Sequence, residues 1–504
     1  MKKNIPGHYD IIIAGAGFAG SLMALILQKT GLNVCLLEKG KHPRFAIGES
    51  STPVADMILR KLSVEYNLPW LHDFSRYGSW QKSHPEIVCG IKRGFCFFKQ
   101  FPGKNFTTDE NHLNELFVAA SSSDMESDTN WLRSDVDAFF VEKVKEYGVT
   151  YLDLAEIVKA ERSHDWKFEI ERLEYNYAIH SSFFIDATGN SSLSEKLMGN
   201  GGSSHEFLTN SFAIFSHFEN VPHWAEILKK NKISMSDYPF NPDLSALHQI
   251  LDEGWMWMLR FNDNRTSVGF VVDNEKNNYD ELSTEDLWNG FLQKYPAVRS
   301  ILNDSNLHFT PGKIIRSRRL QRKMKKCFGE GWVALPHTAG FVDPLFSSGI
   351  AHTLSGIEKL AEIFKRFPET DDEFYNNLYE YQKGIFEELR LIDCLVAGCY
   401  KTMYCFELFV SWSMLYFAAS IAHEHSRMNG RDSRLFLNAD DVHIQRIVFD
   451  SYEDLLKIVS SGTPSADEIK AFTAIIKKRI EPFNTAGLLD PSCKNMYRHT
   501  IAAI

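Results

Sequence analysis

The residues near the start of the chain best suited to chemistry are three glycines and one glutamate. The segment YDIIIAGAGFAG ends an apolar run in Gly15, Gly17 and Gly20, and the next apolar run closes at Glu38. Gly15 permits a tight turn, Gly17 lets a pyrophosphate approach the backbone, and Gly20 lets helix and strand pack closely. Free N–H groups at the helix start attract phosphates, and Glu38 can accept hydrogen bonds from ribose hydroxyls. The pattern predicts a dinucleotide site on a strand–turn–helix–strand unit.

Two later segments have the form of further parts of the same nucleotide site. The apolar run FFID ends in Asp-Ala-Thr-Gly at residues 186–189, and ALPHTAGFVDPLFSSGIAH at 334–352 runs a strand into a helix. Together with the glycine-rich turn they resemble the three separated pieces that surround one FAD in the flavoprotein monooxygenase fold. Because the sequence has a single glycine-rich fingerprint, we expect no separate Rossmann site for NAD(P)H. Pro336-His337-Thr338 stands where Gly-Asp-Ala is usual, which predicts loosely held FAD.

Five short motifs follow one another along the first 350 residues. They are GAGFAG (15–20), HPRFAIGES (42–50), CGIKRGF (89–95), GWMWM (254–258) and GFVDPLFSSGI (340–350). This series resembles the flavin-dependent halogenases, and most closely the branch that acts on phenols. One motif departs from the family's Trp-x-Trp-x-Ile-Pro signature, because Leu259-Arg260 stands for Ile-Pro.

The resemblance implies halogenation of an aromatic ring. In the family, a separate NAD(P)H-dependent flavin reductase supplies FAD as FADH2. O2 then gives the flavin C4a-hydroperoxide, which oxidises chloride or bromide to hypohalous acid. This acid reaches a lysine beside a small electron-rich aromatic substrate, and electrophilic substitution follows. By the same resemblance we expect a phenol or resorcinol, while a carrier-bound substrate and the choice of halide stay open.

A lysine in the CGIKRGF motif is the candidate catalytic residue. Lys92 matches the family's lysine, and Lys99 is the alternative seven residues further on. An amine can hydrogen-bond hypohalous acid or form a haloamine, and burial suits this role because it lowers the pKa. Glu49, in the Ile-Gly-Glu-Ser segment, is expected to support the site by hydrogen bonding. It could instead belong to the cap of a helix that starts near Thr52-Pro53.

Two other groups of residues are expected beside the flavin. Trp255 and Trp257 share one face of a strand, and the resemblance makes them a wall between flavin and substrate. Cross-strand aromatic packing explains the same spacing. Ser347, Ser348 and Gly349 open a helix, whose N–H groups and dipole would hold the halide.

The resemblance also implies a set of cofactor-binding residues. They are Gly15, Gly17, Phe18, Ala19, Gly20, Glu38, Arg44, Arg133, Asp343 and Pro344. For Arg133, an ion pair with Asp135 or Asp137 on the same expected helix is an equally good account. No metal is expected, because the sequence has neither an H-E-x-x-H motif nor a Cys/His ligand spacing.

Three competing functions remain open. An aromatic hydroxylase has the same fold, but commonly reads Ala-Asp-Gly where this chain has Ala187-Thr188-Gly189. A reductase of isoprenoid double bonds shares the Asp-Ala-Thr-Gly form, yet needs neither Lys92 nor the tryptophan pair. A non-catalytic FAD-fold binding or escort protein would suit weak flavin binding, but has no use for Phe-Ser-Ser-Gly together with Lys92.

The composition of the chain limits the partners and the cellular compartment that we expect. The net charge of −10 disfavours nucleic acid, which requires clustered cations. Eight cysteines without a C-x-x-C pair are typical of free thiols in a reducing compartment, so we expect a cytoplasmic protein. MKKNIPGHYD leads directly into the first expected strand, which argues against a signal peptide. The apolar run Met403–Ala422 contains Glu407, Ser411 and Ser413, so we expect a buried helix and no membrane contact.

These elements define the expected architecture. We expect an α/β protein with a Rossmann-type FAD-binding fold of the flavoprotein monooxygenase kind, a β-sheet substrate domain and a C-terminal helical cap. The FAD-binding, monooxygenase-like module would span 1–360, and the cap 361–504. Within the module, the FAD parts are about 1–88, 131–200 and 311–360, and the substrate parts about 89–130 and 201–310. The polar stretch 119–130 predicts a flexible loop or lid, and 131–149 a helix.

Overall fold

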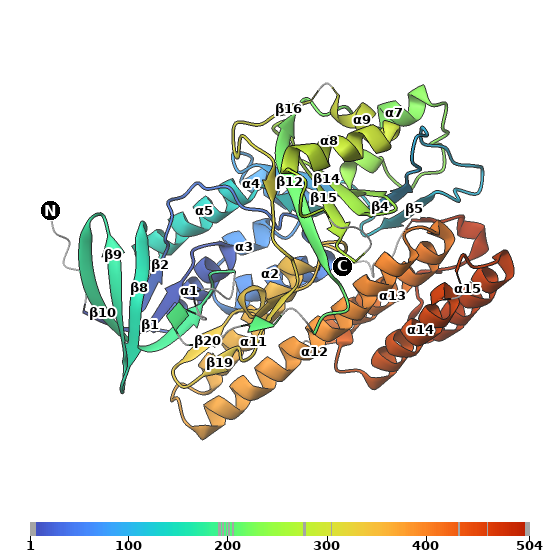
Figure 1. Ribbon diagram of the computed structural model, residues 1–504. Helices are drawn as coiled ribbons and strands as arrows, with labels where there is room; N and C mark the ends of the chain where they lie inside the picture. The colour runs from blue at the N-terminus through green and yellow to red at the C-terminus, as the bar shows by residue number, and fades with distance from the viewer. Residues whose placement is uncertain are drawn as a thin grey trace.

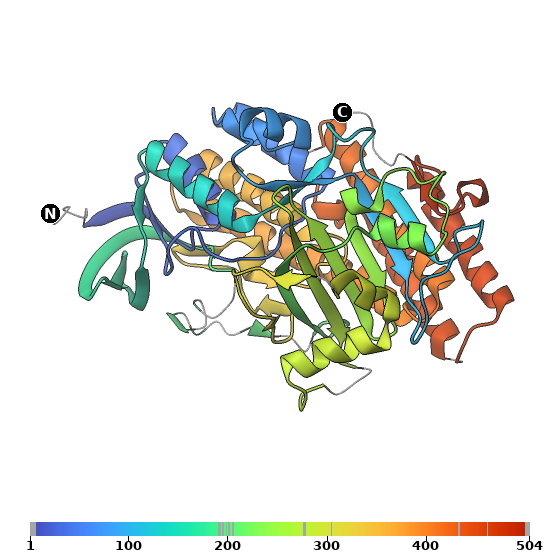
Figure 2. The ribbon, with the colours of Figure 1, turned by 90° about the horizontal axis from the view of Figure 1, so that it is seen from above.

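The computed structural model shows two large sheets and a helical C-terminal part (Figure 1). The structure describes residues 7–189, 193, 196–197, 199, 202–203, 206–275, 279–303, 305–431, 434–460 and 462–498. Helices α14 (Val442–Ser460) and α15 (Ala466–Ile480) lie at the opposite end of the molecule from the hairpin β8–β9 (Ala155–Arg162 and Trp166–Arg172). Figure 2 shows the same separation from above.

The first sheet is the dinucleotide-binding part of the fold. Its strand order is β19-β20-β10-β1-β2-β7, with β9 and β8 continuing from β10. The bounds are β1 His8–Ala14, β2 Val34–Leu37, β7 Thr150–Leu152, β10 Tyr175–Asp186, β19 Phe328–Gly329 and β20 Trp332–Ala334. The strands from β20 to β7 run parallel, and β1, β2 and β20 are apolar and mostly buried, as is usual for parallel strands, whereas β7 at the edge is half-buried. The packed helices are α1 Phe18–Lys29, α5 Arg133–Glu146, α2 Pro53–Glu65 and α11 Ser348–Arg366.

The second sheet is mostly antiparallel, with order β16-β12-β15-β14-β13-β4-β5-β22 and β17 beside β12. The bounds are β4 Gly94–Lys99, β5 Glu115–Ala119, β12 Ser211–Glu219, β13 Ala246–Ile250, β14 Gly254–Arg260, β15 Arg265–Asp273, β16 Asn306–Leu307, β17 Ile315–Arg316 and β22 Met496–Tyr497. Helices α7 (Trp224–Lys230), α8 (Thr284–Lys294) and α9 (Pro296–Leu302) share a hydrophobic core with this sheet. Side chains alternate along β14. Trp255 and Trp257 join the large core that includes the first sheet, whereas Met256 and Met258 join a second core.

Small elements connect the two sheets. A two-stranded ribbon pairs β3 (Cys89–Lys92) with β6 (Asp128–Trp131), and a three-stranded one has the order β11 (Gly202–Ser203), β18 (Arg322–Met324) and β21 (Gly340–Phe341). The short helices are α3 (Trp70–Asp73), α4 (Tyr77–Ser83) and α10 (Pro336–Ala339). The ribbon β3–β6 carries Lys92 and therefore positions the candidate catalytic amine.

The C-terminal part is built from long helices. Helix α12 spans Asp372–Thr402 and α13 spans Phe406–Met428, and both continue into the core shared with the first sheet. After these helices the chain returns to the second sheet, where β22 pairs in parallel with β5. The apolar run expected as a buried helix lies in α13, whose side chains are mostly buried. No helix within the described residues is long and apolar enough to cross a membrane.

The predicted fold class is confirmed, and one local prediction is wrong in part. The helix expected over 131–149 is α5, Arg133–Glu146. The loop expected over 119–130 is shorter, because Asp128–Trp131 forms β6 against β3. Asp128, Thr129 and Asn130 are buried although they are polar, so the sequence pattern there does not indicate a strand.

Candidate active site

The glycine-rich turn has the close approaches that its sequence predicts. Gly15 has φ of +101°, and a Cβ there would lie 2.5 Å from the carbonyl oxygen of Ala187. A Cβ on Gly20 would lie 1.9 Å from the carbonyl oxygen of Gly15, so helix and strand meet too closely for a side chain. At Gly17, no backbone atom is among the nearest neighbours of an added Cβ. The turn packs against backbone at Gly15 and Gly20, whereas side-chain atoms alone lie near the position where a phosphate would approach.

Two arginines and one aspartate, Asp137, lie around Gly17, and Glu38 lies beside the neighbouring residue Ala16. The nearest atoms to a Cβ on Gly17 would include Nη2 of Arg133 at 3.3 Å and Nη2 of Arg44 at 3.9 Å. Arg133 also forms an ion pair with Asp137 at 3.0 Å, which confirms the ion-pair account of this residue, while its contact with the cofactor stays a prediction. Glu38 accepts from the N–H of Ala16 at 3.0 Å and from the N–H of Gly40 at 2.8 Å.

The charge of Glu38 is held by its surroundings. Burial by itself raises the pKa of this carboxyl, but Arg44 and the N–H donors of Gly40 and Ala16 outweigh it and lower the pKa. Both ring nitrogens of His42 and the Nε of Arg44 are buried without a hydrogen-bond partner. A buried arginine donor and an imidazole without full hydrogen-bond partners beside a glycine-rich turn fit a phosphate-bearing dinucleotide such as FAD.

The Asp-Ala-Thr-Gly and Pro-His-Thr segments contact each other at the carboxyl end of the sheet. The N–H of Gly189 donates to Oγ1 of Thr338 at 3.1 Å, and Nε2 of His337 lies 3.2 Å from the carbonyl oxygen of Ala187. Half-buried Arg322 donates to the carbonyl oxygens of Gly189 and His337. Burial lowers the pKa of His337 to about 4, so its ring is neutral at pH 7. The segment therefore contributes no charge where the family usually has an aspartate.

Asp343, predicted to bind the cofactor, has its carboxyl in protein contacts. One oxygen accepts from the hydroxyls of Ser211 at 3.0 Å and Tyr400 at 2.8 Å, and the other accepts from the N–H of Leu345. Burial raises the pKa of Asp343 to about 7, against the pull of these donors. The side chain thus ties the loop before α11 to α12, next to half-buried Pro344.

The expected halide segment begins α11. Ser347 is the N-cap residue, has φ of 52°, and makes no side-chain hydrogen bond to the helix. Ser347 and Ser348 are buried, whereas Gly349 is exposed, and a Cβ on Gly349 would meet no atom within 4 Å. The first N–H groups of a helix have no intrahelical partner. This helix start therefore has the dipole and the open space that a small anion needs.

The two tryptophans lie together as their spacing predicts. Their ring centres are 6.0 Å apart on β14, and both side chains are buried. Nε1 of Trp255 donates to the hydroxyl of Tyr400 at 3.2 Å, and Nε1 of Trp257 donates to Oγ of Ser267 at 3.0 Å. A Cβ on Gly269 would lie 2.2 Å from the Trp257 ring, so the glycine makes room for it. The pair is fixed by its own hydrogen bonds.

Lys92 ends β3 and is fully buried. Its Nζ donates to the backbone carbonyl of Ser51 and lies 4.2 Å from the centre of the Phe95 ring. Pairing of β3 with β6 places Lys92 opposite Asp128. Burial lowers the pKa of Lys92 to about 8, while Asp128 and Asp56 act in the opposite direction. The amine is therefore close to its titration point at physiological pH.

Two carboxyls that the sequence analysis missed complete this cluster. Burial and the neighbouring Asp128 raise the pKa of Asp56 on α2 well above its ordinary value. Burial raises the pKa of Asp128 to about 6, although Lys92 lowers it. Asp128 is therefore charged at neutral pH and balances the Lys92 ammonium, whereas burial and the neighbouring Asp128 favour the neutral form of Asp56. Lys99, the alternative, has other partners: Asp252 at 2.6 Å and the carbonyl of Met403 at 2.8 Å.

Glu49 has a partner that the motif does not reveal. Its Oε1 lies 2.7 Å from Nε2 of His217 on β12, and both side chains are buried. Helix α2 begins at Pro53 with Thr52 as N-cap residue, as expected, but without a side-chain capping hydrogen bond. Glu49 thus joins the segment before α2 to the second sheet.

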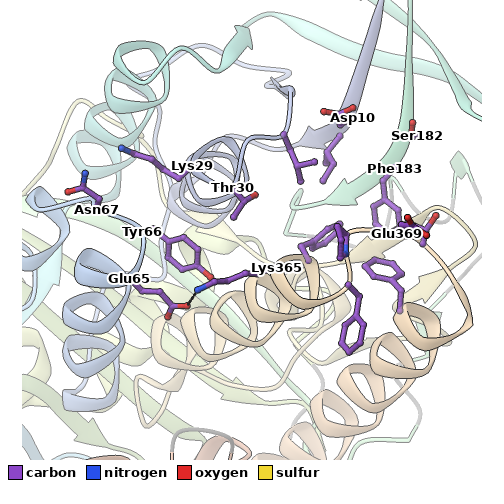
Figure 3. Close-up of a pocket in the computed structure, with 17 residues that line it drawn as sticks. Asp10, Lys29, Thr30, Glu65, Tyr66, Asn67, Ser182, Phe183, Lys365 and Glu369 are labelled. Carbon is purple, nitrogen blue, oxygen red and sulfur yellow. Dashed lines mark hydrogen bonds and ion pairs between the residues drawn. The ribbon is translucent and has the colours of Figure 1, made fainter.

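The structure also has a cleft of about 940 Å³. None of the predicted site residues lines it. Figure 3 shows its lining side chains, which include Asp10 at the amino end of β1 and Lys29 at the end of α1. An ion pair between Lys365 and Glu65, with a distance of 2.9 Å, crosses one side of it. Parallel sheets bind nucleotides at the carboxyl ends of their strands, so this cleft is not the flavin site.

The fold and the glycine-rich turn define a Rossmann-type dinucleotide-binding protein in which a buried lysine lies on a separate ribbon. The tryptophan halogenase family model matches residues 132–403, and a model for NAD(P)-binding Rossmann-like domains matches 13–84. The chain therefore belongs to the tryptophan halogenase family. It is a flavin-dependent halogenase, an oxidoreductase that uses FAD as FADH2 together with O2 and a halide.

Curated relatives and solved structures agree with this assignment. The chain is 25% identical over 501 residues to monodechloroaminopyrrolnitrin halogenase PrnC of Pseudomonas fluorescens, covering 94% of this chain and 85% of the relative. It is 24% identical over 492 residues to tetracycline 7-halogenase of Kitasatospora aureofaciens, covering 91% and 85%. The structure of halogenase PltM in complex with phloroglucinol and FAD matches with a TM-score of 0.85 at 23% identity, covering 98% of this chain and 100% of that one. This structural likeness shows a shared fold.

Proposed function

We propose that this enzyme chlorinates or brominates a phenol or resorcinol, with Lys92 directing the halogen to the ring. The observation that carries the proposal is the fully buried Lys92 amine, whose pKa is lowered to about 8 by burial. A solved relative by fold, PltM, was crystallised with phloroglucinol, a phenol, which supports this class of substrate.

FAD would be held by the glycine-rich turn and its neighbours. Gly17 offers the open approach for the pyrophosphate, Arg44 and Arg133 lie beside it, and Glu38 closes the adjacent strand. When bound, reduced flavin and O2 supply the oxidising equivalents that convert halide into an electrophilic halogen. Because the sequence has one dinucleotide fingerprint, a separate NAD(P)H-dependent flavin reductase is proposed to supply the reduced cofactor.

The start of α11 would hold the halide. Ser347 and Ser348 are buried and Gly349 borders open space, so an anion there meets N–H groups and little competing protein. Trp255 and Trp257, each fixed by a hydrogen bond from its indole N–H, would separate flavin from substrate. A rigid wall keeps the oxidant from transferring oxygen directly to the ring.

Lys92 would act through its N–H groups. One of them donates to the Ser51 carbonyl, which leaves two donors for hypohalous acid. Charged Asp128 favours the ammonium form of Lys92. Burial has the opposite effect and lowers the pKa of Lys92, so that the ammonium loses a proton more easily. Glu49, paired with His217, would hold the segment that carries Ser51 in place.

The proposal is tested by product analysis. The protein is incubated with FAD, a flavin reductase, NADH, air and chloride or bromide, and offered phenols, resorcinols and indoles. We expect products in which one ring hydrogen is replaced by halogen, read by mass and isotope pattern, with phenols and resorcinols preferred. Products that gain one oxygen and no halogen would indicate a hydroxylase and overturn the proposal.

A further inference from the structure

A small cavity lies between α13, the start of α2 and the second sheet. Its lining includes Thr52 and Pro53 from α2, Phe95 from β4, and Tyr416, Phe417 and Glu424 from α13. Its volume is about 20 Å³. This volume is enough for one water molecule, so a ring enters only if aromatic side chains of α13 turn aside. The walls are mainly apolar and aromatic, with few polar groups.

The cavity borders the Lys92 site. The Phe95 ring that lines the cavity lies 4.2 Å from Nζ of Lys92. The same Nζ donates to the carbonyl of Ser51, and the next two residues of the chain, Thr52 and Pro53, line the cavity. A ring bound here would therefore be close to the amine that is proposed to deliver the halogen.

Glu424 is the acidic residue of this lining, and its carboxyl lacks a full set of hydrogen-bond partners. Its side chain belongs to a residue with only 3% exposure. Oε1 accepts from Oγ of Ser420 at 3.1 Å, but Oε2 is buried with no hydrogen-bond partner. Burial raises the pKa of Glu424 to about 8, and the neighbouring Asp128 adds to the rise. A neutral carboxyl with one unpartnered oxygen is costly unless a water molecule or a hydroxyl of a bound ligand completes its hydrogen bonds.

We propose that Glu424 is a specificity-determining residue whose unpartnered Oε2 hydrogen-bonds a ring hydroxyl of the substrate. This inference rests on the proposed function and deepens it, because it names the group that selects phenols. A protonated carboxyl can both donate to and accept from a phenolic hydroxyl. Asp56 and Asp128 lie in the same cluster as Lys92, and Asp128 also interacts with Glu424. The charge of Asp128 disfavours a substrate carboxylate near the cavity, since like charges repel.

The test compares three variants of the full-length enzyme. Glu424→Leu removes the hydrogen-bonding group at similar size, and Glu424→Gln keeps a donor and an acceptor. Glu407→Leu is the matched control, because Glu407 lies on the same helix but is exposed. For each variant we measure kcat and KM for halogenation of resorcinol, and the affinity of the flavin-free protein for resorcinol by calorimetry.

We expect Glu424→Leu to raise KM and weaken resorcinol binding about 10- to 100-fold, with a smaller effect on kcat. Glu424→Gln should stay within about threefold of the wild type and show that the helix is intact, and Glu407→Leu should change neither quantity. Unchanged KM and affinity in Glu424→Leu would overturn the inference, as would a Gln variant as defective as the Leu variant. If the wild type binds resorcinol but yields no halogenated product, the proposed function fails, while the calorimetric comparison still decides the role of Glu424.

Discussion

The buried amine of Lys92 makes the stability of the fold depend on pH above neutrality. Burial lowers its pKa in the folded state from the ordinary value of 10.5 to about 8. Between these values the unfolded chain binds one more proton than the folded chain, so the free energy of unfolding rises as the pH rises. Below pH 8 the amine is charged in both states, and its cost to stability is constant. Lys92→Met removes this titration.

The size of the effect follows from the difference between the two pKa values. The change from 10.5 to about 8 corresponds to about 3 kcal/mol in total, of which about 2 to 3 kcal/mol is gained by pH 10. The wild type should therefore become more stable than Lys92→Met by that amount between pH 7 and pH 10, relative to their difference at pH 7.

Urea unfolding followed by tryptophan fluorescence, at several pH values from 7 to 10, measures this difference. Lys313→Met is the control, because Lys313 is exposed and its charge stays in water in both states. The control should keep the pH dependence of the wild type. A Lys92→Met variant whose stability runs parallel to the wild type across this range would show that Lys92 is not a desolvated amine.

Two substitutions test the cofactor and halide sites separately. Gly17→Val places a side chain against Arg133, since a Cβ there would lie 3.3 Å from its Nη2, and we expect FAD binding, measured by flavin fluorescence, to weaken at least about tenfold. Unchanged FAD affinity would exclude this turn as the pyrophosphate site. Gly349→Val meets no atom within 4 Å of its Cβ, so the fold should tolerate it, but the valine would cover the start of α11. We expect the KM for halide to rise about tenfold with FAD affinity unchanged, and an unchanged halide KM would place the halide elsewhere.

Local sequence patterns predicted the parts of the site that lie on one short stretch of chain. The glycine-rich turn was predictable because its steric demands fall within a few residues, and the structure has the close approaches at Gly15 and Gly20. The common face of Trp255 and Trp257 followed from the period of a strand. Lys92 was found through its motif, and its burial at a strand end agrees with the flanking apolar residues.

The groups around Lys92 could not be predicted in this way. Asp128 lies opposite Lys92 only because β6 pairs with β3, and its polar neighbours looked like a loop. Asp56 comes from α2 and Glu424 from α13, so tertiary packing alone brings them together. His217 is a lone histidine in an apolar strand, and nothing local connects it to Glu49. A sequence signal for such residues would be the rare placement of charged side chains within otherwise apolar elements.

The central claim is that Lys92 directs an electrophilic halogen to an aromatic ring. The most direct measurement supplies FADH2 and bromide at equal rates to the wild type and to Lys92→Met, with resorcinol present, and quantifies brominated product by mass. We predict brominated resorcinol from the wild type and a loss of at least about a hundredfold in the variant, while both consume reduced flavin and O2 at the same rate. Bromination by Lys92→Met at the wild-type rate, or oxygenated product alone from the wild type, would contradict it.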